Sequence, residues 1–266
     1  MTPLILTFLA LLNTLTPQEV RDGWILLFDG QTLSGWDDPA RKSPPGDSWS
    51  VEDGAIHGKS HPKVREDLLT NRTFNNFELV FEWKIPKGSN SGVKYRIQDR
   101  VLLVGGKLNP ASKRFEDTVD YEYEHRLGRR DVIQPGEHVE DYPIAFEYQV
   151  IDNQGHLDAR RGPKYSAGSL YSLIGPTEQT AKPVGDWNTG RIVLRGNRVE
   201  HWLNGVKVVD TNLGSAEIAE SLAKRWGTES PVYRLLTTQP KKSCPVGLQN
   251  HNDEVWFRNL KIRPLE

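Results

Sequence analysis

The chain has 266 residues, and its 34 Lys and Arg nearly balance its 35 Asp and Glu, which leaves a net charge of −1. A chain without a cationic excess lacks the basic surface by which proteins bind nucleic acid. The single cysteine, Cys244, excludes an internal disulfide framework and a zinc cluster of several thiolates, and the 36% apolar content excludes a disordered chain. Eight tryptophans among 23 glycines and 17 prolines favour a β-rich protein, and the length fits one all-β domain as well as two ordinary domains.

The chain begins with an apolar run over residues 3–12. This run is too short to span a bilayer as a helix, but it suits the apolar region of a signal peptide. The polar residues from Thr16 onward are typical of the start of a mature chain. We therefore expect residues 1–16 to be a signal peptide and the protein to be periplasmic or extracellular. The alternative is an N-terminal strand or helix of the fold.

After residue 20 the chain consists of short alternating segments separated by turn residues. In the clearest one, residues 77–85, apolar side chains occupy every second position, as on the buried face of a strand. Asp53-Gly54 and Asn204-Gly205 each lie between two such segments and predict tight hairpins. The pattern predicts one all-β domain over residues 20–266, a sandwich or a barrel. The expected strands cover residues 24–28, 49–52, 55–58, 77–85, 92–97, 145–151, 191–194, 198–203, 206–209 and 255–262.

Two segments depart from the strand pattern. Residues 100–143 are charged and poorly periodic, which indicates an insertion beside the sandwich. Residues 215–228 have Ile218, Leu222 and Trp226 at helical spacing, which predicts one short surface helix.

Strand alternation also predicts a polar sheet face. If Val93 and its alternating neighbours pack inward, Lys94 and Arg96 lie on the opposite face, and the same argument places Glu147 and Gln149 there. Carboxylate, amide and cationic groups together suit a hydroxyl-rich ligand such as a sugar. An ordinary solvated face with ion pairs is the alternative.

Three further positions are candidates for binding or catalysis. His251 lies in a polar turn before the last expected strand and is suited to acid–base work, although a surface or capping histidine is the alternative. Asn90 lies at the start of an expected strand. Trp187, followed by Asn188, either stacks on a sugar ring or plugs the end of the sandwich. The other histidines show no metal-ligand spacing, and the common nucleophile, nucleotide and zinc motifs are absent from the sequence.

A series of short motifs in a fixed order resembles the 3-keto-disaccharide hydrolase family, formerly a domain of unknown function. Each motif is weak alone, but the order is specific and covers residues 22–264. The motifs are Gly23-Trp24, Leu27–Gly30, Leu33–Trp36, Trp49–Ile56, Asn76–Leu79, Glu82–Lys84, Asn90–Val93, Glu147–Asp152, Lys182-Pro183, Trp187-Asn188, Trp202–Gly205, Gly247–His251 and Phe257–Ile262.

The resemblance implies an all-β, concanavalin A-like jelly roll and a substrate glycoside whose C3 hydroxyl is already a ketone. It implies removal of the C2 proton, β-elimination of the C1 substituent and hydration of the product, which amount to hydrolysis. It also implies an exported protein and an upstream sugar 3-dehydrogenase. The insertion over 100–143 departs from the shorter family pattern.

The same resemblance suggests roles for individual residues. His251 and Glu147 are the expected acid–base pair, and they are also the possible ligands of a divalent metal ion. Lys94 and Arg96 would offset the negative charge of the enediolate. Tyr148 is a further candidate, but strand alternation predicts that it points inward. The residues expected to hold the sugar are Asn90, Tyr148, Gln149, Trp187 and Asn188.

Two other functions remain open at this point. A jelly roll also serves as a non-catalytic carbohydrate-binding module. A conventional glycoside hydrolase would need a second carboxylate near Glu147.

Overall fold

The computed structural model describes residues 12–37, 47–62, 65–104, 139–238 and 240–266. The apolar run at the N-terminus lies almost entirely outside these ranges, so the expected signal peptide stays a prediction. Among the described residues, none of the helices has the length and apolar character that crossing a bilayer requires.

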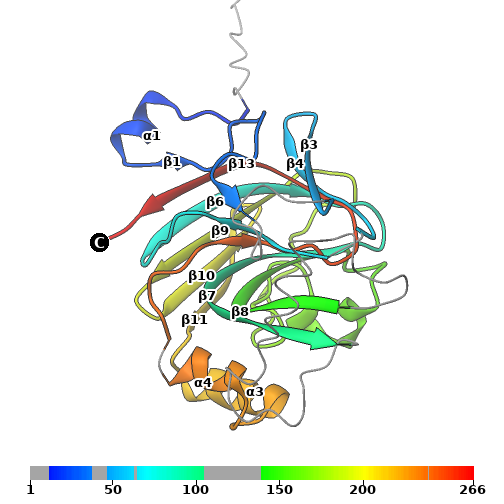
Figure 1. Cartoon of the computed structure of the whole chain (residues 1–266), viewed down its shortest axis with the longest axis vertical. Helices are drawn as coiled ribbons and strands as arrows, with labels where there is room; N and C mark the ends of the chain where they lie inside the picture. Colours follow the sequence, from blue (N-terminus) through cyan, green and yellow to red (C-terminus); the bar gives the residue numbers. More distant parts are fainter. Residues whose placement is uncertain (1–11, 38–46, 63–64, 105–138, 239) are drawn as a thin grey trace, which may run out of the picture.

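Two antiparallel sheets form a sandwich (Figure 1), as the alternating segments predict. The eight-stranded sheet has the order β11-β10-β9-β6-β13-β4-β3, with β1 paired to β13. Its strands are β1 (Ile25–Leu26), β3 (Trp49–Glu52), β4 (Ala55–Gly58), β6 (Phe77–Lys84), β9 (Asn188–Arg195), β10 (Arg198–Leu203), β11 (Val206–Asn212) and β13 (Val255–Pro264). The five-stranded sheet has the order β2-β5-β12-β7-β8, with β2 (Trp36–Asp37), β5 (Leu68–Thr70), β12 (Gly247–Leu248), β7 (Asn90–Val104) and β8 (Val139–Ile151).

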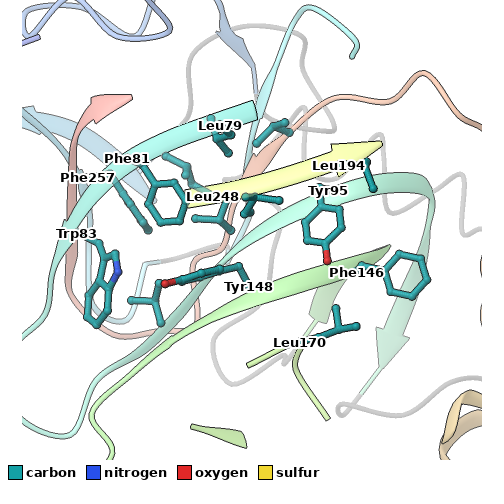
Figure 2. Close-up of a cluster of buried hydrophobic side chains, with 14 of the residues drawn as sticks. Leu79, Phe81, Trp83, Tyr95, Phe146, Tyr148, Leu170, Leu194, Leu248 and Phe257 are labelled. Carbon is teal, nitrogen blue, oxygen red and sulfur yellow. The ribbon is translucent and has the colours of Figure 1, made fainter. Parts of the chain in front are cut away.

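The core fills the space between the sheets (Figure 2). Leu79, Phe81 and Trp83 of β6 are buried at alternate positions, as predicted. Phe81 meets Tyr148 of β8 edge to face, with the ring centroids 5.3 Å apart. Burying a large apolar side chain stabilises the fold by roughly 1.5–3 kcal/mol. The apolar faces of β7 and β8 are therefore held inward, and their opposite faces point outward.

Both predicted hairpins are present. Asp53 and Gly54 join β3 to β4 with φ values of 48° and 72°, and Asn204 and Gly205 join β10 to β11 with 51° and 85°. Positive φ at both central residues is the signature of a type I′ turn, which Asp-Gly and Asn-Gly favour.

The predicted surface helix is α3 (Ala216–Trp226), whose Ser215 cap accepts a hydrogen bond from the backbone of Ile218. Alternation and helical spacing did not predict two shorter helices, α1 (Pro17–Arg21) and α4 (Pro231–Thr237). In Figure 1, α3 and α4 lie together at one end of the sandwich, where α4 packs against β7 and β8.

The ends of the predicted insertion are strand rather than loop. β7 continues to Val104 and β8 begins at Val139, and these two residues pair. Segment 105–138, the rest of the predicted insertion, lies outside the described residues.

Candidate active site

The site is built on the outward face of the five-stranded sheet, where Lys94 of β7 and Glu147 of β8 are paired directly across the ladder. Phe146 and Tyr148 flank Glu147 and point into the core, so alternation turns Glu147 outward. Both charged residues are nevertheless buried, since Lys94 is 3% and Glu147 8% exposed. The two groups therefore share the predicted face of the sheet, but they are buried rather than open to solvent.

Gly92 makes room for the Glu147 carboxyl group. A Cβ atom at Gly92 would lie 2.5 Å from Glu147 Oε1, so no larger residue fits without displacing that group. Gln249 donates from Nε2 to Glu147 Oε2 over 3.1 Å. In the amide orientation that satisfies its neighbours, Gln149 donates to Glu147 Oε1 over 2.9 Å. The carboxyl group is thus held in one position from two sides.

Lys94 forms an ion pair with Asp67, and its charge also acts on Glu147. Its Nζ lies 2.7 Å from Asp67 Oδ2, and the backbone N–H of Asn250 donates to Asp67 Oδ1. The ammonium also lies over the Tyr142 ring, 5.2 Å from its centroid. Burial alone would lower the pKa of Lys94, but the carboxylates of Asp67 and Glu147 outweigh it and raise the pKa well above its usual value. Lys94 is a permanent cation.

Glu147 titrates near neutrality. Burial raises its pKa to about 7, Lys94 opposes that rise, and Asp67 adds to it. The charge of His251 also opposes the rise. A carboxyl group with this pKa is suited to general-base work at neutral pH, since it is ionised in part and still basic.

His251 lies on the loop that follows β12, close enough for its charge to act on Glu147. Its side chain is 38% exposed, and its Nδ1 lies 3.8 Å from Asp253 Oδ2. Asp253 Oδ2 also accepts the backbone N–H of Asn90, which ties the loop to the start of β7. The His251 ring meets the His156 ring edge to face at 6.0 Å between centroids.

Asn90 and Gln149 lie where alternation puts them, but both are buried. The Gln149 amide is within 3.2 Å of Asn90 Oδ1. Their positions suit fixing the Glu147 carboxyl group and the end of β7 rather than open contact with a ligand.

Arg96 is not beside Glu147, contrary to strand alternation. Its φ of 53° and the register shift after Tyr95 mark a bulge in β7. The bulge directs the guanidinium to Gly196 O, at 2.7 Å in the β9–β10 turn, and toward Lys241 O. Burial lowers the pKa of Arg96.

Tyr148 lies in the core, as alternation indicates, and not among groups that could hold a sugar. It is fully buried, and its hydroxyl donates to Trp202 O over 3.1 Å.

Trp187 and Asn188 belong to a different part of the molecule. Arg258 lies over the Trp187 ring at 3.9 Å from its centroid, and Lys84 approaches it at 5.1 Å. Because Trp83 points into the core, Lys84 and the Trp187 ring lie on the outer face of the eight-stranded sheet, opposite to Glu147. The Asn188 side chain accepts from Lys182 N and Asn204 Nδ2, which fixes the loop before β9.

Several residues near Glu147 were missed by the sequence reasoning. Arg225 of α3 stacks over Tyr171, and its charge lowers the Glu147 pKa. Tyr171 donates from its hydroxyl to Asp158 over 2.6 Å. Asp253 and Gln249 had a local signal, because each is two residues from His251. The others, whose positions depend on contacts between remote segments, are Asp67, His156, Tyr171 and Arg225.

A metal ion fits this group of residues poorly. His156, His251 and Asp253 have ligand atoms within 4.8 Å of one another. However, His156 Nδ1 accepts the backbone N–H of Asp158 over 3.0 Å. In a neutral imidazole the proton is then on Nε2, so neither ring nitrogen offers a free lone pair. Two ligands remain, which is fewer than zinc sites use, and the predicted ligand Glu147 is held by the two glutamines.

The sequence matches the profile of the 3-keto-alpha-glucoside-1,2-lyase-like domain over residues 23–263. It is 32% identical over 258 residues to the 3-keto-disaccharide hydrolase of Bacteroides thetaiotaomicron, a match that covers 92% of this chain and 79% of that protein. The fold is similar to a crystal structure of a candidate glycosyl hydrolase from Parabacteroides distasonis, with a TM-score of 0.72, 25% identity and coverage of 96% of this chain and 100% of that one. A second candidate glycosyl hydrolase from that organism gives a TM-score of 0.58 at 22% identity and covers 91% of this chain and 99% of its own.

Proposed function

The chain belongs to the family of the 3-keto-alpha-glucoside-1,2-lyase-like domain, a family of glycosidase-type hydrolases on a concanavalin A-like jelly roll, and we propose that it cleaves 3-keto-glycosides by elimination followed by hydration. The observation that supports this most is the buried Glu147 carboxyl group, whose pKa of about 7 suits removal of a proton from carbon.

The first step uses the ketone at C3 to acidify the C2 proton. Glu147 takes that proton, and the C2–H electron pair forms a C2–C3 double bond while negative charge moves to the C3 oxygen. The enediolate then re-forms the C3 ketone, its electrons make a C1–C2 double bond, and the C1–O bond breaks. The leaving oxygen takes a proton from His251, the more exposed acid of the site.

The second step adds water to the C1–C2 double bond. The hydroxyl group of the water bonds to C1, and the remaining water proton passes to His251, which gave up its own proton in the first step. C2 receives a proton from the Glu147 carboxyl group, whose proton exchanges with solvent before the addition. The product is a 3-keto sugar, so the net reaction is hydrolysis. Lys94 contributes a fixed positive charge next to the base, which keeps a useful fraction of Glu147 ionised and offsets negative charge on the substrate.

A conventional glycoside hydrolase needs a second carboxyl group free to act on the substrate. Asp67 is the second carboxylate near Glu147, but it is buried in an ion pair with Lys94 and accepts the Asn250 N–H. This commitment of Asp67 favours the elimination route.

The route is tested with a 3-keto-glucoside and its unoxidised parent, incubated with the protein in D2O. Elimination followed by hydration places solvent deuterium at C2 of the product, whereas direct displacement at C1 leaves the C2 hydrogen in place. We expect aglycone release from the keto substrate alone, with deuterium at C2. The product incubated with Glu147→Gln controls for spontaneous exchange. Release from the parent alone, or a product without C2 deuterium, contradicts the proposal, and binding without release supports the carbohydrate-binding alternative.

The substrate class also indicates which kind of reaction must come before this one. A 3-keto-glycoside has to be produced by oxidation of a C3 hydroxyl, so a sugar 3-dehydrogenase acts upstream.

We further propose that the protein is exported, since residues 3–12 suit a signal peptide. Cell fractionation tests this: recovery of the protein, with its N-terminus intact, in the cytoplasmic fraction would contradict it.

A further inference from the structure

We propose that His156 is a catalytic residue whose Nε2–H donates a hydrogen bond to the C3 oxygen of the substrate and stabilises the enediolate. This inference rests on the proposed function and deepens it. It gives the role of stabilising the negative charge on the C3 oxygen to a residue outside the predicted acid–base pair.

The backbone around His156 is held firmly. His156 follows the turn at the end of β8, and its N–H donates to Asp152 O over 3.1 Å. The Asp152 carboxylate accepts the N–H groups of Gly88 and Gln154 over 2.8 and 3.0 Å. A Cβ atom at Gly155 would lie 2.2 Å from that carboxylate, so the turn depends on a glycine there. The imidazole is therefore presented from a fixed support, as a preorganised donor requires.

The tautomer of His156 follows from its backbone contact. Nδ1 accepts the N–H of Asp158, the first residue of a 3-10 turn at Asp158–Arg161. An accepting nitrogen carries no proton, so the neutral ring carries its proton on Nε2. Burial lowers the pKa of His156, and the charge of His251 lowers it further, which favours the neutral ring.

His156 Nε2 is left available for a ligand. Within the described part of the chain it has no hydrogen-bond partner, and the residue is half-buried beside His251. His201 shows the contrast, because both of its nitrogens are engaged in the core, by Tyr95 at 3.0 Å and Gly168 O at 3.1 Å. The free nitrogen of His156 and its position next to His251 indicate a role other than packing.

The position also matches the chemistry. Lys94 is committed to Asp67, so a second donor is needed where charge develops on the C3 oxygen. A neutral imidazole N–H can polarise a carbonyl next to a carbon acid, as it does in isomerases that form enediolates. The His156 and His251 rings are neighbours, which lets them serve the oxygen substituents on either side of C2.

The test combines kinetics with a spectroscopic measurement. His156→Ala should lower kcat on a 3-keto-glucoside by about 10²–10³-fold with a smaller change in KM, as expected for loss of one such donor. His156→Gln, which keeps an N–H donor, should recover part of that loss. His57→Ala is the matched control, since His57 stacks on Trp256 in the eight-stranded sheet, away from Glu147. Long-range 1H–15N correlation spectra of the wild-type protein should show the Nε2–H tautomer at His156.

Each result decides between defined outcomes. A His156→Ala variant within threefold of wild-type kcat, in a protein that does release aglycone and exchange C2, overturns this inference and leaves the proposed function standing. An Nδ1–H tautomer in the spectra overturns it independently of activity. Inactivation of the wild type by chelator, restored by Zn²⁺ that binds wild type but not His156→Ala, would make His156 a metal ligand instead. A wild type inactive on 3-keto-glucosides ends both proposals.

Discussion

At the scale of single residues, Glu147 is a base that must be ionised to act but lies in a buried position that favours its neutral form. Burial favours the neutral acid, Lys94 favours the carboxylate, and the balance places the pKa at about 7. Because the folded pKa is above the ordinary value of 4.5, Glu147 stabilises the protein fully below that value. This contribution is lost as the pH rises through 7.

Glu147→Gln should therefore separate stability from activity. The shift from 4.5 to about 7 corresponds to about 3 kcal/mol, so the variant should unfold at a higher temperature than wild type at pH 8. The two should converge near pH 4. Thermal unfolding across this pH range measures the difference, and a difference independent of pH would contradict the assigned pKa. In wild type, kcat/KM should fall as the pH is lowered through 7, and Glu147→Gln should lose most of its turnover.

Gly92 is the second residue whose role can be tested alone. Gly92→Ala places a Cβ 2.5 Å from Glu147 Oε1 and must displace the carboxyl group, so kcat should fall at least tenfold. Gly247→Ala is the matched control. Its Cβ would meet Leu69 Cδ2 at 2.7 Å in the same sheet, which should lower stability with little effect on kcat. Unfolding temperature and kcat are measured for both, and equal losses of kcat would contradict the role of Gly92.

At the scale of elements, strand alternation predicts a side chain's face only while a strand stays regular. It is correct for β6 and for Lys94, Glu147 and Gln149. It fails at Arg96, because the bulge there is set by contacts with Gly196 and Lys241, which lie 100 and 145 residues away in sequence. No local pattern records such contacts.

Helix α3 is the element that connects the end of the sandwich to the site. Its Arg225 contacts Tyr171 and donates to Ser172 Oγ, so the helix helps to place the groups that flank Glu147. Ser215→Ala removes the N-terminal cap and should lower the free energy of unfolding by about 1 kcal/mol. Ser215→Asp should retain it. Denaturant unfolding measures both, and an unchanged Ser215→Ala would show that tertiary packing alone holds α3.

At the scale of the whole molecule, the tryptophans have two different environments. Trp36, Trp49 and Trp83 are buried, whereas Trp187 and Trp256 form cation–aromatic contacts on the outer face of the eight-stranded sheet. The number of tryptophans favours a β-rich protein, but composition cannot tell these two environments apart. The fold and the Lys94–Glu147 pair follow from alternation. Asp67, His156 and Arg225 come from segments that only the folded sheet and its flanking helix bring together.

The near-zero net charge has a kinetic consequence. The proposed substrate is a neutral glycoside, and Lys94 and Glu147 are buried, so we expect no long-range steering that salt could screen. The value of kcat/KM should change less than twofold between 50 and 500 mM NaCl. Initial rates at low substrate concentration measure it, and a steep fall with salt would indicate a charged substrate.

The pairing of Val104 with Val139 joins segment 105–138 to the molecule at the open end of an established hairpin. We therefore expect that replacing this segment with a two-residue Asn-Gly turn would leave strand order and register unchanged. Because the same two strands carry Lys94 and Glu147, we expect a chain shortened in this way to retain the paired charges of the site.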